Sequence, residues 1–345
     1  MQAIQEIKII QSEDFYLKQL KFRALINKYI REFFSLKSVL EVETPMLSNS
    51  GNPDPALLSF STQYHGPGPY YQQEFYLNTS PEFAMKRLLA QGSGAIYSLA
   101  KVFRDGECGA RHNPEFTLLE WYQPDYSLDS MINETIELIN TLYTQTRAAA
   151  QLLNVDVISI SIEKVTKIKY RDLFLDTINI DPMLASLAEL QECISLHNID
   201  IDFIAYDKDE YLDIIISHII EPKLELNSLT VVYNYPASQA ALAQTKLDDG
   251  FYVGARFEIY WQGLELANGF HELGDSDEMR TRFLAQNKIR IAKELKPLKI
   301  DDAFLSSLNN LPDCSGIALG LDRLIMCLLG CKSISEILSI DFNNA

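Results

Sequence analysis

The hydrophobic pattern opens with one long stretch of helical periodicity. Between Leu17 and Phe33, apolar side chains recur at intervals of three and four residues, which places them on one face of an α-helix. The pattern predicts a helix over residues 13–38. An alternating strand follows over residues 39–44, and Pro45 ends it because proline cannot donate to a strand ladder. The apolar face of the helix can pack either on its own domain or on a second subunit.

The rest of the chain alternates between short strands and helices, with no internal repeat. Residues 155–230 mix a short strand over 156–162 with helices around 184–196 and 209–226, and are interpreted as an insertion or a helical layer. No change of composition demands a second domain. The pattern predicts a loop over 48–75, a strand from 76 that turns into a helix near 82, a hairpin over 96–122, helices over 127–153 and 275–296, strands over 229–235, 251–260 and 265–272, and a strand from 315 that turns into a helix near 321.

The hairpin over residues 96–122 carries the first candidate chemistry. Arg104 stands at the end of its first strand, beside a loop rich in glycine and charge. The planar fork of an arginine at such a place can bind a phosphate. On the second strand, Glu120 and Tyr122 fall on one face and can hold an amine. The alternative is an ordinary surface hairpin whose charges are solvated.

Two further segments contain carboxylates or an arginine in unusual surroundings. Glu258, Glu265 and Glu272 are spaced by seven residues, so a hairpin can bring them together, and grouped carboxylates need a cation such as Mg²⁺. They can also be three unrelated surface glutamates. Arg323 falls in the first turn of a helix, where the helix dipole disfavours a cation. That position suggests an anionic partner for Arg323.

Composition and charge narrow the possible partners and the compartment. The 345 residues include 30 basic and 47 acidic ones, a formal charge of −17. So acidic a chain repels phosphate backbones, and we expect no stable binding of nucleic acid. The five cysteines fit no disulfide or zinc pattern, and we see neither a secretion signal nor an apolar run of membrane-spanning length. We therefore expect a cytoplasmic protein that does not bind membranes.

Three stretches together resemble the three motifs of class II aminoacyl-tRNA synthetases. The helix and strand that end at Pro45 look like motif 1, Phe103-Arg104 with residues 112–116 looks like motif 2, and residues 320–323 look like motif 3. The lysine-specific branch is indicated by further segments: Thr79-Ser80-Pro81-Glu82, residues 111–117, Glu120 with Tyr122, and Glu265, Asn268, Gly269, Phe270 and Glu272.

The resemblance implies an α+β fold, in which a central antiparallel sheet is flanked by helices, and a homodimer formed through motif 1. A lysyl-tRNA synthetase carries an anticodon-binding domain of about 100 residues ahead of motif 1. Motif 1 lies at the start of this sequence, so we expect one catalytic domain over residues 1–345 and no anticodon-binding domain. The chain is then similar to the truncated lysyl-tRNA synthetase paralogues that act as elongation factor P–(R)-β-lysine ligases. Ala318, where lysyl enzymes usually have glycine, also fits that group.

This resemblance implies ATP and Mg²⁺ as cofactors and a reaction in two steps. The carboxylate of (R)-β-lysine attacks the α-phosphate of ATP, which gives an adenylate and pyrophosphate. The ε-amine of a lysine on elongation factor P then attacks the adenylate and releases AMP. Catalysis would come from orientation and charge stabilisation.

The roles implied for individual residues follow from their motif positions. Arg104 and Arg323 would be catalytic and hold the phosphates, and Glu258 and Glu265 would carry the metal. The expected ATP-binding residues are Arg104, Asp105, Gly106, Glu107, His112, Asn113, Phe116, Glu265, Leu266, Gly320 and Arg323. The expected amino-acid-binding residues are Ser80, Pro81, Glu82, Glu120, Tyr122, Asn268, Glu272 and Ala318.

One position departs from the family pattern, and two other functions stay open. Gly106 stands where these enzymes usually have a glutamate, so adenine recognition is expected to shift to Glu107 or to the main chain of Asp105 and Gly106. One alternative function is an enzyme that activates α-lysine for an RNA acceptor. The other is an inactive paralogue that binds an amino acid and regulates a partner.

Overall fold

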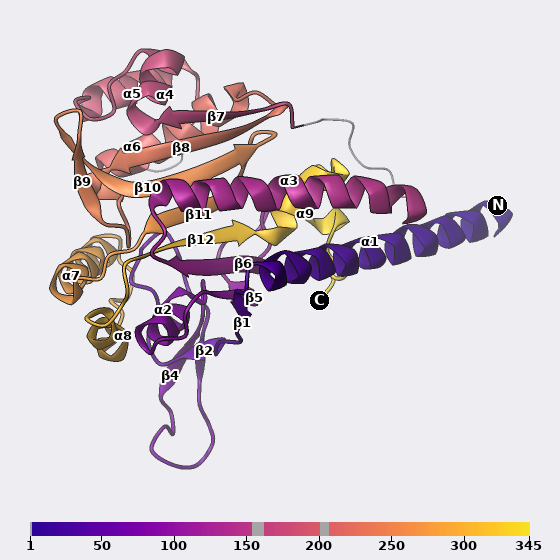
Figure 1. The fold of residues 1–345 in the computed structure, drawn as a ribbon, viewed down its shortest axis with the longest axis horizontal. Helices are drawn as coiled ribbons and strands as arrows, with labels where there is room; N and C mark the ends of the chain where they lie inside the picture. The colour runs from indigo at the N-terminus through magenta and orange to yellow at the C-terminus, as the bar shows by residue number, and fades with distance from the viewer. Residues whose placement is uncertain (1, 154–161, 201–206) are drawn as a thin grey trace.

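The computed structural model describes residues 2–153, 162–200 and 207–345 of the chain. Within them, one nine-stranded sheet forms the centre of the molecule, with the strand order β1-β5-β6-β12-β11-β10-β8-β7 and with β9 paired to β10 (Figure 1). The strands of this sheet are β1 (Leu40–Glu41), β5 (Ile96–Phe103), β6 (Glu115–Pro124), β7 (Lys164–Lys169), β8 (Ser228–Pro236), β9 (Thr245–Asp248), β10 (Phe251–Trp261), β11 (Leu264–His271) and β12 (Cys314–Gly320).

Helices cover the sheet, and a small second sheet lies below it in the view of Figure 1. The second sheet contains β2 (Leu47–Ser48), β3 (Ser61–Gln63) and β4 (Glu74–Leu77). The α-helices are α1 (Gln2–Leu36), α2 (Glu82–Ala90), α3 (Leu128–Leu153), α4 (Tyr170–Ile178), α5 (Leu187–Leu196), α6 (Lys208–Ile215), α7 (Ser276–Ala292), α8 (Asp302–Leu308) and α9 (Leu321–Leu329). In the described part of the chain, no helix is both long and apolar enough to cross a membrane.

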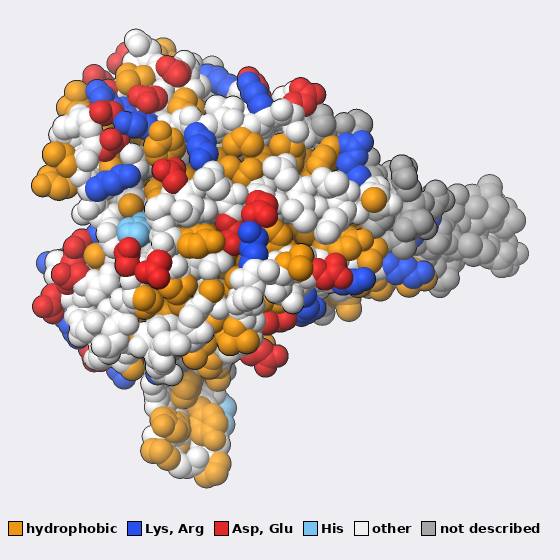
Figure 2. Space-filling model, viewed as in Figure 1, with side chains coloured by type: hydrophobic (Ala, Val, Ile, Leu, Met, Phe, Trp, Pro, Cys, Tyr) orange, Lys and Arg blue, Asp and Glu red, His pale blue; other side chains and the backbone are white. Residues whose placement is uncertain are grey.

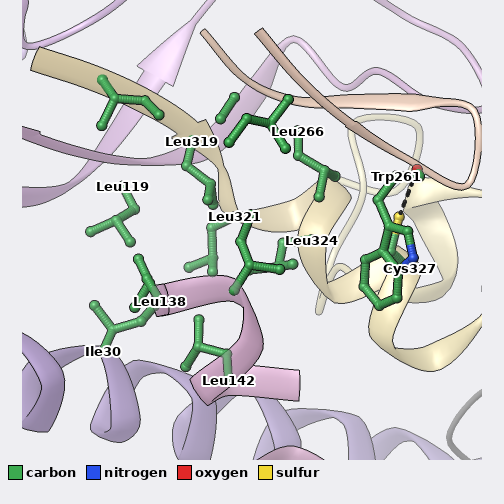
Figure 3. Close-up of a cluster of buried hydrophobic side chains, with 14 of the residues drawn as sticks. Ile30, Leu119, Leu138, Leu142, Trp261, Leu266, Leu319, Leu321, Leu324 and Cys327 are labelled. Carbon is green, nitrogen blue, oxygen red and sulfur yellow. Dashed lines mark hydrogen bonds between the residues drawn. The ribbon is translucent and has the colours of Figure 1, made fainter. Parts of the chain in front are cut away.

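The alternation of side chains along the central strands divides the sheet into an apolar face and a polar face. Leu119 and Leu319 point to the side covered by α1, α3 and α9, where they join a large buried cluster (Figure 3). Ile30 from α1, Leu138 from α3 and Leu324 from α9 belong to the same cluster. Because successive residues of a strand face opposite ways, Glu120 and Ala318 point to the other side. The main core thus fixes which face is left for a polar site.

The predicted long helix and most of the predicted strands are confirmed, and two details are wrong. The strand expected over residues 39–44 is reduced to β1, which pairs with β5 in parallel. The sheet is also not wholly antiparallel, because β7 pairs with β8 in parallel at the other edge. Parallel neighbours need a crossover connection, and the helices α4 to α6 belong to the crossover that joins β7 to β8.

The segment interpreted as an insertion or helical layer is therefore partly a strand of the main sheet. The strand β7 has the sequence Lys-Val-Thr-Lys-Ile-Lys. With three lysines among its six residues, it does not show a clear alternation of apolar and polar positions. The strand predicted over residues 156–162 lies almost wholly outside the described residues. The predicted loop over 48–75 contains β2, β3 and the start of β4, and its tip projects from the body with tyrosines exposed (Figures 1 and 2).

Candidate active site

A cavity of about 540 Å³ lies over the polar face of the central strands. Its floor is built from rows of residues on β6, β12, β11 and β10 that stand opposite one another in the strand register. One row consists of Glu120, Ala318, Asn268 and Glu258, and the next consists of Tyr122, Gly316, Phe270 and Arg256. All eight residues line the cavity. The sheet register thus brings together side chains as far apart in the chain as Glu120 and Ala318.

Most of the predicted site residues line this single cavity. They are Ser80, Glu82, Arg104, Glu107, His112, Asn113, Phe116, Glu120, Tyr122, Glu258, Glu265, Leu266, Asn268, Glu272, Ala318, Gly320 and Arg323. Among the described residues, Pro81, Asp105 and Gly106 are not part of the lining. The amide of Asp105 donates to the carbonyl of Leu58 at 2.8 Å, so in this structure it is already satisfied within the protein. Gly106 occupies a turn with φ of +82°, and Pro81 precedes the first turn of α2.

The amino-acid end of the cavity is centred on the buried carboxylate of Glu120. Tyr122 and Ser80 each donate a hydroxyl to it at 2.7 Å. Ser80 also accepts a hydrogen bond from the amide of Glu82, the first residue of α2, at 3.0 Å. The same hydroxyl therefore contacts the start of α2 and positions Glu120. Burial, together with the charge of Glu82, raises the pKa of Glu120 to about 8. An ammonium group bound beside this carboxylate would stabilise its ionised form.

Glu272 stands at the same end and has a partner that the sequence analysis missed. The ammonium of Lys86 lies 2.5 Å from a Glu272 oxygen and 2.7 Å from a Glu82 oxygen. Burial raises the pKa of Glu272 to about 8, although Lys86 opposes the shift. Burial also works against the charge of Lys86, but the two carboxylates raise its pKa above the ordinary value. The signal in the sequence was the spacing of Glu82 and Lys86, which puts both on one face of a helix.

The spacing of Glu258, Glu265 and Glu272 left open either one cluster or three unrelated surface residues, and the structure shows neither. All three line the cavity, but at different places. Glu258 stands opposite Asn268, and Glu265 stands opposite Tyr260. Glu272 follows the end of β11 and interacts with Lys86, Glu82 and Glu120. The three carboxylates therefore divide between the amino-acid end and a second end of the cavity, because Glu265 and Glu272 lie near opposite ends of the extended strand β11.

The second end of the cavity holds the two predicted phosphate-binding arginines. Arg323 donates to the carbonyl of Glu265 at 2.9 Å and to its carboxylate at 3.4 Å, and its other nitrogen lies 2.5 Å from His112. Arg104 contacts Glu107 at 3.5 Å and stacks its guanidinium 5.0 Å from the ring centre of Phe116. Both guanidinium groups thus face the cavity beside carboxylates. The anionic partner expected for Arg323 includes Glu265.

Carboxylates gather around these arginines, and one of them was missed. Burial and the charge of Glu258 raise the pKa of Glu265. Burial, then Glu265 and Glu258, raise the pKa of Glu221 to about 8. Glu221 follows a helical stretch in a region whose residues gave no chemical signal. Burial is the largest cause of both shifts, and Glu221 lies close enough to Glu265 and Glu258 for their charges to add to its own shift, although it does not line the cavity.

The residues at this end fit ATP with a divalent cation. Glu258 is already satisfied by the hydroxyls of Tyr235, at 2.6 Å, and Tyr260, and by Arg256, so Glu265 is the more available of the two expected ligands. In the described ranges, no three His, Cys, Asp or Glu side chains form a metal cage. Mg²⁺ does not need one, because it is usually bound by one or two carboxylates together with phosphate oxygens and water. A cation beside Glu265 would also lower the pKa of this carboxyl group, because a nearby positive charge favours the ionised form.

The side chain of Asn113, an expected adenine contact, forms hydrogen bonds within the protein. Its amide nitrogen donates to the carbonyl of Glu115 at 2.6 Å, and its oxygen accepts from the amide of Phe342 at 3.1 Å. The side chain therefore ties the motif 2 loop to the C-terminal segment. Its role toward adenine stays a prediction.

Comparison with known proteins gives consistent matches along the chain. A family model described as tRNA synthetases class II (D, K and N) matches residues 7–341. The chain is 41% identical over 333 residues to the elongation factor P–(R)-β-lysine ligase of Haemophilus influenzae strain PittGG, covering 95% of this chain and 96% of the relative. It is 41% identical over 330 residues to that of Histophilus somni strain 2336 and 39% identical over 327 residues to that of Klebsiella pneumoniae. The matches span nearly the whole length of these relatives.

Proposed function

The chain belongs to the class II tRNA synthetase family (D, K and N), and we propose that it is an ATP-dependent ligase for (R)-β-lysine and elongation factor P. In the first step, the carboxylate of (R)-β-lysine attacks the α-phosphate of ATP, and pyrophosphate leaves. In the second step, the ε-amine of a lysine on elongation factor P attacks the acyl carbon. The amide bond forms, AMP leaves, and the amine gives up a proton.

The observation that carries this proposal is the charge of the amino-acid end. Glu82, Glu120 and Glu272 surround one region of the cavity, and among the described residues the cation beside them is Lys86. A substrate with two ammonium groups supplies the positive charge that this end lacks. Ala318 lies between Glu120 and Asn268 in the sheet register, so its methyl group forms the pocket wall where an amino acid would lie. This placement supports a role for Ala318 in the choice between α- and β-lysine.

ATP would occupy the end that contains the two arginines. Arg104 and Arg323 would bind the phosphates, and Glu265, with Glu258 behind it, would hold Mg²⁺. When bound, the metal neutralises phosphate charge and withdraws electrons from the reacting phosphorus. The guanidinium groups stabilise the charge that develops as pyrophosphate leaves. No side chain is needed as a nucleophile, because the substrate's own carboxylate performs that role.

The quaternary structure and the compartment are part of the same proposal. The helix α1 and the following strand leave leucines exposed, including Leu36 and Leu40, which are 87% and 57% exposed. We expect this surface to form a homodimer through motif 1, since exposed apolar patches on soluble proteins often mark interfaces. The acceptor is a translation factor, so we place the protein in the cytoplasm, without stable binding to nucleic acid or to a membrane.

The decisive experiment is ATP–pyrophosphate exchange with α-lysine and with each enantiomer of β-lysine, followed by transfer to purified elongation factor P. We expect exchange to be fastest with (R)-β-lysine and to require Mg²⁺. A strong preference for α-lysine would instead favour an enzyme that charges an RNA. Absence of exchange with all three amino acids would leave only an inactive amino-acid-binding paralogue.

A further inference from the structure

Lys86 is an unusual residue at the amino-acid end of the cavity. Its side chain is completely buried, although lysine is among the residues least often found fully buried. It does not line the cavity, whereas its two partners, Glu82 and Glu272, do. Its ammonium bridges α2, which carries Glu82, to the segment after β11, which carries Glu272.

A purely stabilising role explains this arrangement poorly. Burying an ion pair costs desolvation energy that the attraction between the charges often fails to recover, so such a pair is weak evidence for stability. Around Lys86, α2 already packs through Met85 and Leu89 against Tyr122 and Cys314. Neither oxygen of Glu272 has a well-directed hydrogen-bond donor in the described part of the chain. The ion pair therefore leaves Glu272 with capacity for another cation.

We infer that Lys86 is a built-in counter-cation that sets the charge of the amino-acid subsite to match a substrate with two ammonium groups. When ionised, Glu82, Glu120 and Glu272 carry three negative charges, and Lys86 removes one of them. The remaining charge of −2 balances the charge of +2 on the two ammonium groups of β-lysine or α-lysine. Lys86 acts through Glu82 and Glu272 and is therefore a positioning residue. This inference rests on the proposed function, in that it concerns the same amino-acid subsite.

The groups that face this cluster come from four elements. Glu82 and Lys86 belong to α2, Glu120 and Tyr122 to β6, Cys314 to β12, and Glu272 to the segment after β11. The pKa values of Tyr122 and Cys314 are raised by burial and by these carboxylates, so both stay neutral near pH 7. The balance of charge is therefore decided by the three glutamates and Lys86.

Removal of the Lys86 charge has a specific consequence for substrate binding. With Lys86→Met, three carboxylates face only the two ammonium groups of the substrate. One carboxylate then keeps a proton in the complex, because like charges so close in a buried site disfavour ionisation. The protonated carboxyl group binds an ammonium group more weakly than a carboxylate does. The proton leaves this carboxyl group only when the pH rises. Affinity for the diamine should therefore become more dependent on pH than in the natural protein.

The test is the affinity of (R)-β-lysine and of α-lysine, measured by calorimetry without ATP from about pH 6.5 to about pH 9. For Lys86→Met we expect affinity at least about tenfold weaker near pH 7, the effect of one pKa unit, with a gap that narrows as the pH rises. Arg87→Met is the matched control, since Arg87 is the neighbouring cation on α2 and is exposed. It should bind as the natural protein does.

A double variant keeps the inference testable if Lys86→Met does not fold. Glu82→Gln with Lys86→Met removes one charge of each sign, so the net charge of the buried cluster stays the same although Glu272 loses its direct ion pair with Lys86. The subsite charge returns to −2, and the pH dependence of binding should return to that of the natural protein even though a contact is lost. If Lys86→Met keeps the natural pH dependence, or if the double variant does not restore it, the inference is wrong. Because no ATP is used, this outcome is separate from any failure of the exchange assay.

Discussion

At the scale of single residues, burial of charge is what distinguishes the site from the surface. Glu120 and Glu272 are almost fully buried, and each has a pKa of about 8. Most of the other described acidic residues of this negatively charged chain are at least partly exposed to solvent. Glu120 and Glu272 are among the few buried ones, and they share a cavity with arginines that face carboxylates. Function therefore depends on a few charges whose protein partners do not fully neutralise them.

Arg323 gives the first residue-scale prediction. Its guanidinium faces the cavity from the first turn of α9 and is held by the carbonyl of Glu265 and by His112. Arg323→Ala should lower the rate of ATP–pyrophosphate exchange by about 100- to 1000-fold, as for the loss of one contact to developing charge. The unfolding temperature should change little. Near-normal exchange in this variant would remove Arg323 from the phosphate site.

At the scale of elements, β12 is the strand on which both ends of the site depend. Its residues alternate between the core and the cavity, and three of them are small: Gly316, Ala318 and Gly320. A Cβ atom at Gly316 would lie 2.3 Å from the ring of Tyr122 and 2.5 Å from a Glu272 oxygen. At Gly320 the nearest protein atom to such a Cβ would be 3.7 Å away. The two glycines thus have different reasons to be small.

The substitutions Gly316→Ala and Gly320→Ala should therefore separate the two substrates. In Gly316→Ala, the new methyl group displaces Tyr122 or Glu272, so the KM for the amino acid should rise at least about tenfold while the KM for ATP stays near normal. In Gly320→Ala, the protein has room for the methyl group, and only the KM for ATP should rise. Exchange assays with one substrate varied at a time measure both. An unchanged amino-acid KM in Gly316→Ala would show that Tyr122 and Glu272 do not touch the amino acid.

The exposed leucines at the end of α1 give a second prediction at this scale. If motif 1 forms the dimer, Leu36→Glu places a charge in an apolar interface, where an unpaired charge is costly. Light scattering after gel filtration should then show a shift from about twice 39.2 kDa to about 39.2 kDa. Leu247→Glu is the matched control, because Leu247 is also exposed but lies on β9. A natural protein that is already monomeric would contradict the proposed dimer.

At the scale of the whole molecule, the site is the part of a well-packed fold in which several charges are buried close together. The apolar cluster under α1, α3 and α9 stabilises a sheet whose other face gathers carboxylates. Asp322 links the two sides, since its buried carboxylate accepts from the amide of Thr117 at 2.7 Å and from Arg23 of α1. Stability of the core therefore compensates for the cost of burying charges close together on the other face of the sheet.

This arrangement predicts how stability depends on pH. The pKa values of Glu120 and Glu272 rise from 4.5 to about 8 on folding, and those of Glu221 and Asp213 shift in the same direction. Between pH 4.5 and about 8, these groups give the folded chain more protons than the unfolded one. Their contribution to the free energy of unfolding therefore falls as the pH rises through this window.

A diamine substrate should reverse that loss, because its ammonium groups favour ionised carboxylates. The rise in unfolding temperature caused by (R)-β-lysine should be larger at about pH 8.5 than at about pH 6. Differential scanning fluorimetry with and without the amino acid measures the difference. Glu120→Gln, which cannot ionise, should show a smaller dependence on pH. An equal shift at both pH values would mean that these carboxylates do not receive the substrate.

The sequence by itself determined the family, most of the elements and most of the residues around the cavity. Helical periodicity, strand alternation and sequence motifs each lie within a short segment of the chain. They can therefore be recognised without knowing how distant segments pack. The tertiary structure alone decided which protein groups contact the site carboxylates. It paired Lys86 with Glu82 and Glu272, buried Glu221 near Glu265 and Glu258, and made the edges of the sheet parallel. These features depend on strand register and burial, which arise from contacts between segments far apart in the chain and leave little trace in any one of them.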